Sequence, residues 1–584
     1  MKKCVKLEYI GVFIVFLAVL IWSLYFGYQK KGYQVDEMYS YGLANSNYRP
    51  FPNLGDTGEY NMNDFMQEYG AGNNVIDLLR NIWKDCCIIS KAKFHIKTTE
   101  LYSALKKAQK THYDMSTITW RSGDFFRDYL TVEKGTGFNY ASVYFNQRSD
   151  VHPPFYYILL HTISSIFTGK FSKWFAFSIN IAALFITAIL LYKLVRQVAG
   201  NYLLALSTVL IYVFSTGYVS TLTFFRMYAL LTLMTVAFCY IHQCLREDDW
   251  ILNRKRKCQI IMITVLGYYT QYYFLIYVAA VVLTVMIYLT CTKRYKLLWP
   301  YFRQFLWAAL CGIVIWPSGI RHIFFGYRGT EAGNSLLHSG SRLKACREMF
   351  DGMRNAMFGE SPIWMYLILF FGILTFFAYI IRKRRNQGNS GIIRYILLFI
   401  PAGLYFVLVS IVSPYSSDRY IMNIMPFAAV LTTLSLYCFI KIVIRNKKLV
   451  IFVLTLSFIE AWVTASAMLH PSGYLKGSEQ EQEKEKLPGN TVCVYVMPDG
   501  HYAEYMKDLT VFAECKSVVI LYESNLAFLE DYQYEEGDTI LFYLAPGTNM
   551  EADIASMTEN MGIGNLQLTK SAMDATYYRI FMYQ

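Results

Sequence analysis

Long apolar runs separated by short basic clusters constrain the fold of this chain more than any other feature of its sequence. A helix needs roughly 20 apolar residues to cross a bilayer. With 55% hydrophobic and only 17% charged residues over 584 positions, the chain is too apolar for a soluble globular protein. The sequence therefore predicts a polytopic α-helical membrane protein with about eleven transmembrane helices. The predicted spans are residues 8–28, 171–193, 202–220, 224–244, 258–272, 274–291, 303–318, 363–381, 394–413, 420–440 and 449–468.

The basic clusters predict how these helices are oriented. Lys and Arg concentrate in the cytoplasmic connections of membrane proteins, and here they fill the even-numbered connections. We therefore expect a cytoplasmic N-terminus, with residues 8–28 as an uncleaved anchor. The same rule explains the net charge of +13 without a nucleic-acid partner. The basic residues are Lys193, Arg196, Arg254, Lys255, Arg256, Lys257, Lys293, Arg294, Lys296, Arg382, Lys383, Arg384, Arg385, Arg445, Lys447 and Lys448.

Three polar parts are predicted on the extracytoplasmic side: a first loop over 29–170, a loop over 319–362 and a tail over 470–584. Residues 153–167 form an apolar segment of the first loop. This segment is short for a span and contains His161, so it is expected to lie in the membrane interface as a helix. We divide the chain into a membrane domain, 1–469, which includes the first loop, and a C-terminal domain, 470–584.

The tail alternates strand-like and helix-like stretches. Runs rich in β-branched and aromatic residues predict strands, and 501–513 and 549–560 predict helices between them. A small α/β domain is therefore expected. Cys493 and Cys515 lie in this domain, and the sequence leaves a disulfide between them open. The predicted strands are 491–496, 518–522, 539–544 and 576–582.

Five short polar motifs fall on the predicted extracytoplasmic side, at or near the ends of spans. Their acidic, histidine, arginine and tyrosine side chains would meet at one membrane face, which favours a single active site there. They are Asp36-Glu37, Asp150-Val151-His152-Pro153-Pro154, Arg226-Met227-Tyr228, Thr270-Gln271-Tyr272-Tyr273 and Asp418-Arg419-Tyr420.

In this order, the motifs VDEMYS, DVHPPFYYILLH, FFRMYALL, TQYY and DRYIMNIMPF resemble the GT-C superfamily of membrane glycosyltransferases. The most similar branch contains protein mannosyltransferases, aminoarabinose transferases and their bacterial family-39-like members. The resemblance covers residues 1 to about 440. It implies a GT-C-like fold and a hexosyltransferase that moves one sugar, with inversion, from a polyprenyl-phosphate donor to an acceptor outside the cell membrane. The acceptor is a protein, a glycolipid or a wall polymer, and the tail either binds it or braces the loops.

The chemistry assigns roles to these side chains. A hydroxyl nucleophile needs a general base, and the resemblance implies that Asp36 is this carboxylate, with Glu37 supporting it and Asp150 as a second catalytic candidate. The leaving phosphate needs charge stabilisation, which arginine provides through planar bidentate contacts. Arg226 and Arg419 lie at extracytoplasmic connections, where the positive-inside rule makes arginine uncommon, and both are expected to bind the leaving phosphate. The resemblance places His152 near the donor phosphate. The weaker substrate-binding candidates are Tyr228, Gln271, Tyr272 and Tyr420.

Each motif also has a structural interpretation. Asp36 and Glu37 could simply end a helix, His152 could cap one, and the arginines could anchor helix ends at the headgroups. The tyrosines suit the aromatic belt of a membrane interface. The branch often carries an arginine where this chain has Lys173 and Asn180, and the first loop is long for the family, which leaves the acceptor open.

Two other functions compete with transfer: a transporter or flippase of lipid-linked sugars, and a polymerase of them. A transporter favours ionisable residues at mid-membrane and paired repeats, whereas here the charges lie mostly at span ends, Glu460 excepted. No cofactor is predicted. A divalent metal is compatible with the chemistry, but no set of metal ligands stands out.

Overall fold

The computed structural model describes two large parts of the chain and leaves several segments out. The described ranges are 2–30, 32–52, 118–324, 342–359, 363–387, 389–443, 473–476, 487–501, 503–532, 537–545, 547–563, 568–572 and 579–583, with short pieces at 54, 76, 79–80, 82–84, 86–87, 333 and 535. The predicted span 449–468 lies outside these residues.

Contacts divide the chain into two compact units, which we describe separately. The helix-bundle unit contains Met1–Gln29, Val151–Tyr156 and Ala176–Tyr474. The loop–tail unit contains Lys30–Asp150, Tyr157–Phe175 and Leu475–Gln584. The first loop thus groups with the tail, whereas the sequence analysis placed it with the membrane helices. The boundary at 469/470 stays a prediction.

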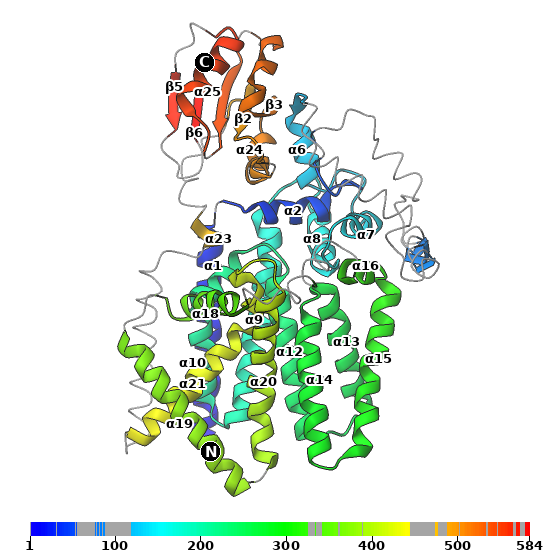
Figure 1. The fold of residues 1–584 in the computed structure, drawn as a ribbon, viewed down its shortest axis with the longest axis vertical. Helices are drawn as coiled ribbons and strands as arrows, with labels where there is room; N and C mark the ends of the chain where they lie inside the picture. Colours follow the sequence, from blue (N-terminus) through cyan, green and yellow to red (C-terminus); the bar gives the residue numbers. More distant parts are fainter. Residues whose placement is uncertain are drawn as a thin grey trace. The chain divides into compact units, whose positions relative to one another are not determined.

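Helices, most of them long and apolar, form the helix-bundle unit (Figure 1). They are α1 (Lys2–Gln29), α9 (Lys173–Ala199), α10 (Tyr202–Val213), α11 (Thr216–Thr223), α12 (Tyr228–Glu247), α13 (Arg254–Thr270), α14 (Phe274–Cys291), α15 (Leu298–Ile315), α16 (Ser318–Phe324), α18 (Arg342–Phe358), α19 (Ile363–Gln387), α20 (Asn389–Val412) and α21 (Met425–Val443). Short 3₁₀ turns are η2 (Tyr295–Leu297), η3 (Asp418–Tyr420) and η4 (Met422–Ile424).

Among the described residues, seven helices are long and apolar enough to cross a membrane, or eight if one bent pair is a single span. The seven match the predicted spans at 8–28, 171–193, 224–244, 274–291, 303–318, 394–413 and 420–440. The predicted span at 258–272 is α13, a helix of 17 residues. This confirms a polytopic helical fold. The described residues establish seven or eight of the eleven predicted spans.

The predicted span 202–220 corresponds to α10 and α11, which meet at a bend of 62° that the sequence analysis did not foresee. Local hydrogen bonds explain the break. Ser215 caps α11 by accepting the amide of Tyr218 at 3.1 Å. The carbonyl of Val213, at the end of α10, accepts the indole N–H of Trp22 at 3.1 Å. The backbone groups released at the bend therefore find partners.

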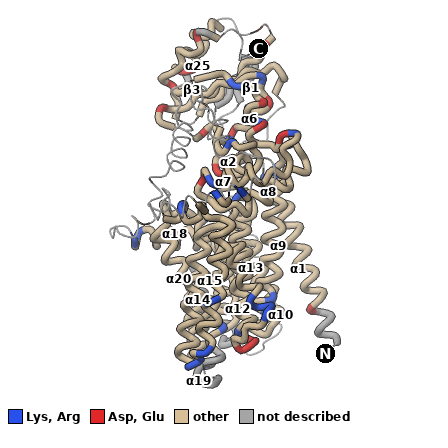
Figure 2. The backbone as a smooth tube through the Cα atoms, turned by 90° about the vertical axis from the view of Figure 1, so that its right-hand side faces the viewer, with Lys and Arg blue, Asp and Glu red and all other residues tan. Residues whose placement is uncertain are grey.

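The helix connections gather at two opposite ends of the bundle. At one end, which we call the basic end, Arg294 contacts Asp249, the amide of Gln243 donates to the carbonyl of Arg394, and Arg196 pairs with Glu8. Figure 2 shows Lys and Arg along this end. At the other end, which we call the α16 end, lie the α11–α12 and α13–α14 connections, α16 and η3. The basic connections therefore lie at one end of the bundle, as their alternation along the sequence predicted.

The loop–tail unit is built on a six-stranded sheet of order β1-β3-β2-β4-β6-β5. Strands β3, β2 and β4 are parallel, and β1 and β6 run antiparallel to their neighbours. The four predicted tail strands are confirmed, and β1 and β5 were not expected. The strands are β1 (Arg121–Ser122), β2 (Thr491–Met497), β3 (Ser517–Tyr522), β4 (Thr539–Leu544), β5 (Leu568–Ala572) and β6 (Arg579–Tyr583).

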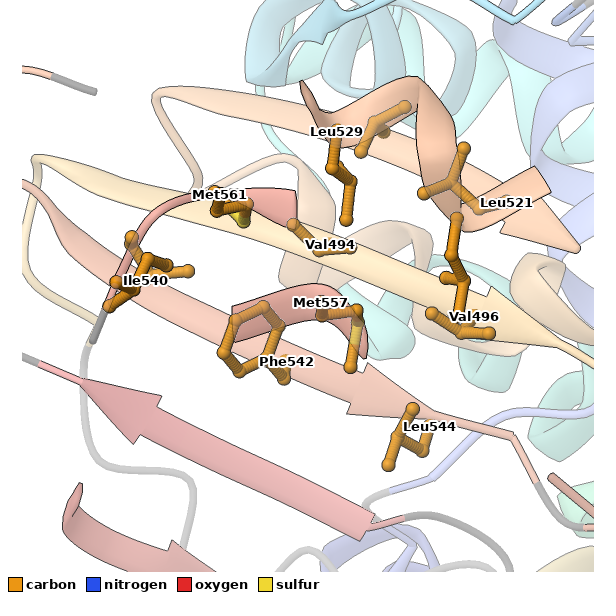
Figure 3. Packing of buried hydrophobic residues seen from close by; sticks show 12 residues of the cluster. Val494, Val496, Leu521, Leu529, Ile540, Phe542, Leu544, Met557 and Met561 are labelled. Carbon is orange, nitrogen blue, oxygen red and sulfur yellow. The ribbon is translucent and has the colours of Figure 1, made fainter. Parts of the chain in front are cut away.

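Helical elements cover both faces of this sheet. On one face, η6 (Glu523–Asp531) and α25 (Met550–Asn560) pack on apolar side chains of β2, β3 and β4 (Figure 3). On the other face, η5 (Glu504–Asp508) and α24 (Leu509–Phe512) bring Phe512 against Tyr495, with ring centroids 5.4 Å apart. The central strands β2, β3 and β4 are buried on both faces, which explains why they are continuous apolar runs. The predicted helix 501–513 is instead a 3₁₀ turn followed by one α-turn.

The first loop contributes a strand and helices to this unit. Its helices are α2 (Val35–Asn45), α6 (Gly123–Leu130), α7 (Tyr140–Ser149) and α8 (Phe155–Ile166), of which α8 is the helix expected at 153–167. Strand β1 extends the sheet beside β3, and Phe126 of α6 packs on Phe512 at 5.3 Å. The guanidinium of Arg127 donates to the carbonyl of Ala513 at 2.6 Å. Cys493 and Cys515 are free thiols here.

Candidate functional site

The first turn of α2 carries both acidic residues of the motif. Glu37 is fully buried and accepts the Lys30 ammonium at 3.1 Å and the Gln34 amide at 2.7 Å. Gln34 completes a capping box at this helix start. These are the contacts of a residue that fixes the helix N-terminus. Asp36, the residue before Glu37 in this turn, is only half-buried.

Three further contacts hold α2 in place. The phenol of Tyr41 donates to the carbonyl of Ser172 at 2.8 Å. The imidazole Nδ1 of His161 lies 2.8 Å from the carbonyl of Ala44, so Nδ1 carries the proton and donates. Burial lowers the pKa of His161 to about 4, which keeps the ring neutral near pH 7. Gly42 allows Tyr129 to lie directly on the helix, since a Cβ at that position would come within 1.9 Å of its ring.

Asp150 closes α7 in the same unit. It is the C-cap of that helix, and its amide donates to the carbonyls of Asn146 and Gln147. Burial raises the pKa of the Tyr129 phenol, and the charges of Tyr505 and Asp150 add to this effect. Asp36, Glu37 and Asp150 therefore all belong to the loop–tail unit.

The other predicted site residues belong to the helix-bundle unit, and the structure brings two of them into contact. Arg226 and His152 are 74 residues apart in sequence, yet Nη2 of Arg226 lies 3.2 Å from Nε2 of His152. A guanidinium can only donate, so this imidazole nitrogen accepts, and the ring is neutral with its proton on Nδ1. Arg226 is buried, with 4% of its surface exposed.

The backbone around Arg226 is fixed by an asparagine that the sequence analysis had noted only as a departure from the family pattern. The amide of Asn180 donates to the carbonyls of Leu222 at 3.0 Å and Phe224 at 2.8 Å. Phe224 O also accepts the amide of Arg226 at 2.8 Å. Asn180 is fully buried on α9. These hydrogen bonds stabilise the non-helical connection between α11 and α12, where Arg226 lies.

A second Arg–His pair, which the sequence analysis missed, lies on α16 and contacts Tyr272 of the α13–α14 connection. Nη2 of Arg321 lies 3.0 Å from Nε2 of His322, whose Nδ1 lies 2.9 Å from the phenol oxygen of Tyr272. The indole of Trp316 donates to the same oxygen at 2.8 Å. Arg321 and His322 are both buried on α16. The sequence signal was available: Arg321 follows the end of the predicted span 303–318, as Arg226 lies at the start of the predicted span 224–244.

Arg419 and Tyr420 lie on η3. The Arg419 guanidinium sits 4.9 Å from the ring centroid of Tyr415 and 5.1 Å from that of Tyr420, within cation–π range. The ring of Tyr420 also packs on Tyr273 at 5.5 Å, which places η3 beside the Gln271–Tyr272 connection. Tyr228, the remaining predicted residue, stacks on Phe224 at 5.6 Å. The α16 end therefore gathers three arginines, each flanked by aromatic or imidazole rings.

A metal site is a separate question. Among the described residues, no group of three or more His, Cys, Asp and Glu side chains could hold a metal ion.

Comparisons with known proteins give a limited result. No protein-family model matches the chain, and no curated protein does. Among solved structures, the chain is similar to ArnT from Cupriavidus metallidurans, in the apo state and bound to undecaprenyl phosphate. Each comparison gives a TM-score of 0.41 and 13% sequence identity and covers 74% of this chain and 87% of ArnT.

Proposed function

We propose that this chain is a membrane hexosyltransferase that moves one sugar from a polyprenyl-phosphate donor to an extracytoplasmic acceptor, with inversion. The contact between Arg226 and His152 carries the proposal. A buried guanidinium at the end of a helix bundle, oriented by a neutral imidazole, suits a lipid phosphate at the membrane surface. The lipid chain of the donor would then lie against the apolar helices.

The reaction would be a single displacement at the anomeric carbon. Asp36 would accept the proton of the acceptor hydroxyl as the new glycosidic bond forms, and the bond from the sugar to the phosphate would break. Arg226 would stabilise the charge that develops on the leaving phosphate, and Arg419 is proposed as a second phosphate contact. Tyr228, Gln271, Tyr272 and Tyr420 would line the donor site, whereas Asp150 would orient the acceptor.

The membrane arrangement is part of the proposal. The N-terminus and the basic end would face the cytoplasm, and the α16 end and the tail would face outward. This follows from the concentration of Lys and Arg at the basic end. The donor phosphate would thus be bound on the side where acceptor glycans are assembled.

Sugar transfer from a radiolabelled polyprenyl-phosphate hexose, measured in membranes that contain the full chain, tests the assignment. Asp36→Asn should abolish transfer with the donor still bound, because only the base is lost. Arg226→Lys keeps the charge but loses the planar contact, and should weaken both donor binding and transfer. Asp124→Asn is the matched control, since this carboxylate is 71% exposed and belongs to the same unit as Asp36.

Three results would decide against parts of this proposal. Full transfer by Asp36→Asn would move the base elsewhere, with Asp150→Asn the next variant. Donor binding unchanged by Arg226→Lys would remove the phosphate role. If no polyprenyl-phosphate sugar is consumed by the wild type, the enzyme proposal fails.

The bend between α10 and α11 keeps a second function in view. Broken helices are a feature of transporters, which bind substrate at such interruptions. A flippase would move a fluorescent lipid-linked sugar across a proteoliposome membrane without cleaving it. Translocation without consumption of the sugar would favour the transporter, and consumption with inversion would favour the transferase.

A further inference from the structure

Tyr474 occupies the point at which the chain leaves the helix-bundle unit. It lies in the short helix α23 (Gly473–Lys476) and is the last residue of that unit, because Leu475 already belongs to the loop–tail unit. The sequence analysis placed this region at the start of the tail and assigned no role to it. Its side chain nevertheless makes two specific contacts within the helix bundle.

The first contact is a stack of aromatic rings. The ring of Tyr474 stacks on Phe224 with centroids 4.1 Å apart and an interplanar angle of 20°. Phe224 in turn stacks on Tyr228, at 5.6 Å and 12°. Phe224 stands two residues before Arg226, and its carbonyl accepts the Arg226 amide. Tyr474 therefore packs on the turn that carries this arginine.

The second contact reaches the other arginine motif. The phenol of Tyr474 donates to Oδ1 of Asp418 at 3.2 Å. Asp418 begins η3 and directly precedes Arg419. The hydroxyl of Ser417 reaches the same carboxylate oxygen at 3.5 Å. One side chain thus joins the turn at Arg226 through its ring and the turn at Arg419 through its hydroxyl.

We propose that Tyr474 is a positioning residue that fixes the Arg226 turn relative to the Arg419 turn, and so couples the segment leading to the tail to anion binding at the α16 end. The anion part rests on the proposed function. Two guanidiniums can share one phosphate only if the turns that carry them keep a fixed separation. Phe224 and Asp418 lie on separate connections, and Tyr474 contacts both.

The ring and the hydroxyl can be separated by substitution. Tyr474→Leu removes both contacts, whereas Tyr474→Phe keeps the stack and loses only the bond to Asp418. Asp418→Asn weakens the same bond from the other side. Tyr295→Leu is the matched control, because this tyrosine is 60% exposed in the connection before α15, at the basic end.

Hydrogen exchange of the full chain in nanodiscs measures positioning without any assumption about activity. The reporters are the amides of Arg226 and Ile421, which bond to Phe224 and Asp418. Tyr474→Leu should speed exchange at both, Tyr474→Phe mainly at Ile421, and Tyr295→Leu at neither. Unchanged exchange at both amides in Tyr474→Leu would overturn the proposal.

Binding and turnover measure the coupling. With undecaprenyl phosphate as the probe, Tyr474→Leu should weaken binding about 10- to 100-fold, since small displacements of binding groups have effects of this order. The KM for the donor should rise more than kcat falls, and Tyr474→Phe should recover most of the loss. Faster exchange in both turns with unchanged probe binding would overturn the coupling. If the wild type binds no undecaprenyl phosphate, the proposed function is refuted. The hydrogen-exchange result would still test whether Tyr474 positions the two turns.

Discussion

The buried ion pair at the start of α2 makes a quantitative prediction. Lys30 and Glu37 have no exposed side-chain surface, and their charged atoms are 3.1 Å apart. Removing one partner of a buried pair leaves the other charge desolvated, at a cost of about 3–5 kcal/mol. Lys30→Met should therefore destabilise α2 by this amount. Glu37→Gln should also destabilise it, because the capping interaction with Gln34 is weakened as well.

Hydrogen exchange of the α2 amides is the appropriate assay, since it reports local opening in the intact membrane protein. A cost of 3 kcal/mol corresponds to roughly 100-fold faster exchange, at about 1.4 kcal/mol per factor of ten. Lys170→Met, at an exposed lysine of the same unit, should leave exchange unchanged.

The double variant Lys30→Met/Glu37→Met separates charge burial from packing. It removes both charges at once, and buried pairs replaced by apolar side chains are often neutral in stability. The remaining loss is the cap, typically about 1 kcal/mol. Exchange should then be far slower than in either single variant. Additive effects, or exchange within threefold of the wild type in Lys30→Met, would refute the buried pair.

Three further predictions concern the loop–tail unit. Since burial lowers the folded-state pKa of His161 to about 4 from an ordinary 6.5, the folded protein binds fewer protons between these values and loses stability as pH falls; His161→Gln should flatten the fall of Tm from pH 7 to 4.5. Gly123→Ala would place a Cβ 2.3 Å from the carbonyl of Cys515, so it should cost about 1–3 kcal/mol and speed amide exchange in β3; slow exchange there would contradict the close contact. Burial and the neighbouring Glu523 raise the pKa of Asp553 to about 6, so its ionisation opposes folding above that pH; Asp553→Asn should raise Tm at pH 8 more than at pH 5.

The sequence predicted the helix bundle well, because membrane-spanning helices need long apolar runs, and such runs are visible in a single sequence. It predicted the bend at Ser215 poorly. A break needs only a capping serine and an indole from another helix, Trp22, which is 191 residues from the carbonyl that it binds. Neither interrupts the hydrophobic run.

The contacts of the candidate site were also difficult to predict, because they join residues far apart in the sequence. Arginine at a short connection singled out Arg226 and Arg419, but the contact of Arg226 with His152 joins turns 74 residues apart, which no local pattern reveals. The pairing of β1 with β3 could not be foreseen either. Two residues carry no strand pattern, and their partner lies almost 400 positions away in the chain. Tyr474 was overlooked for a related reason, since no neighbouring residue in the sequence indicates its contacts with Phe224 and Asp418.

The direction of the hydrogen bonds in the two Arg–His pairs decides which charge an anion would meet. Arg226 and Arg321 can only donate, so His152 and His322 accept through Nε2 and are neutral in this arrangement. The positive charge then resides on guanidiniums, which stay protonated at any physiological pH. A polyprenyl-phosphate sugar is a phosphodiester with one constant charge, so its affinity should be flat between about pH 5 and 7. The released polyprenyl phosphate is a monoester that gains a second charge near pH 6, and its affinity should rise over the same range. Donor binding that weakens with rising pH would show instead that the imidazoles carry charge, and would overturn this assignment.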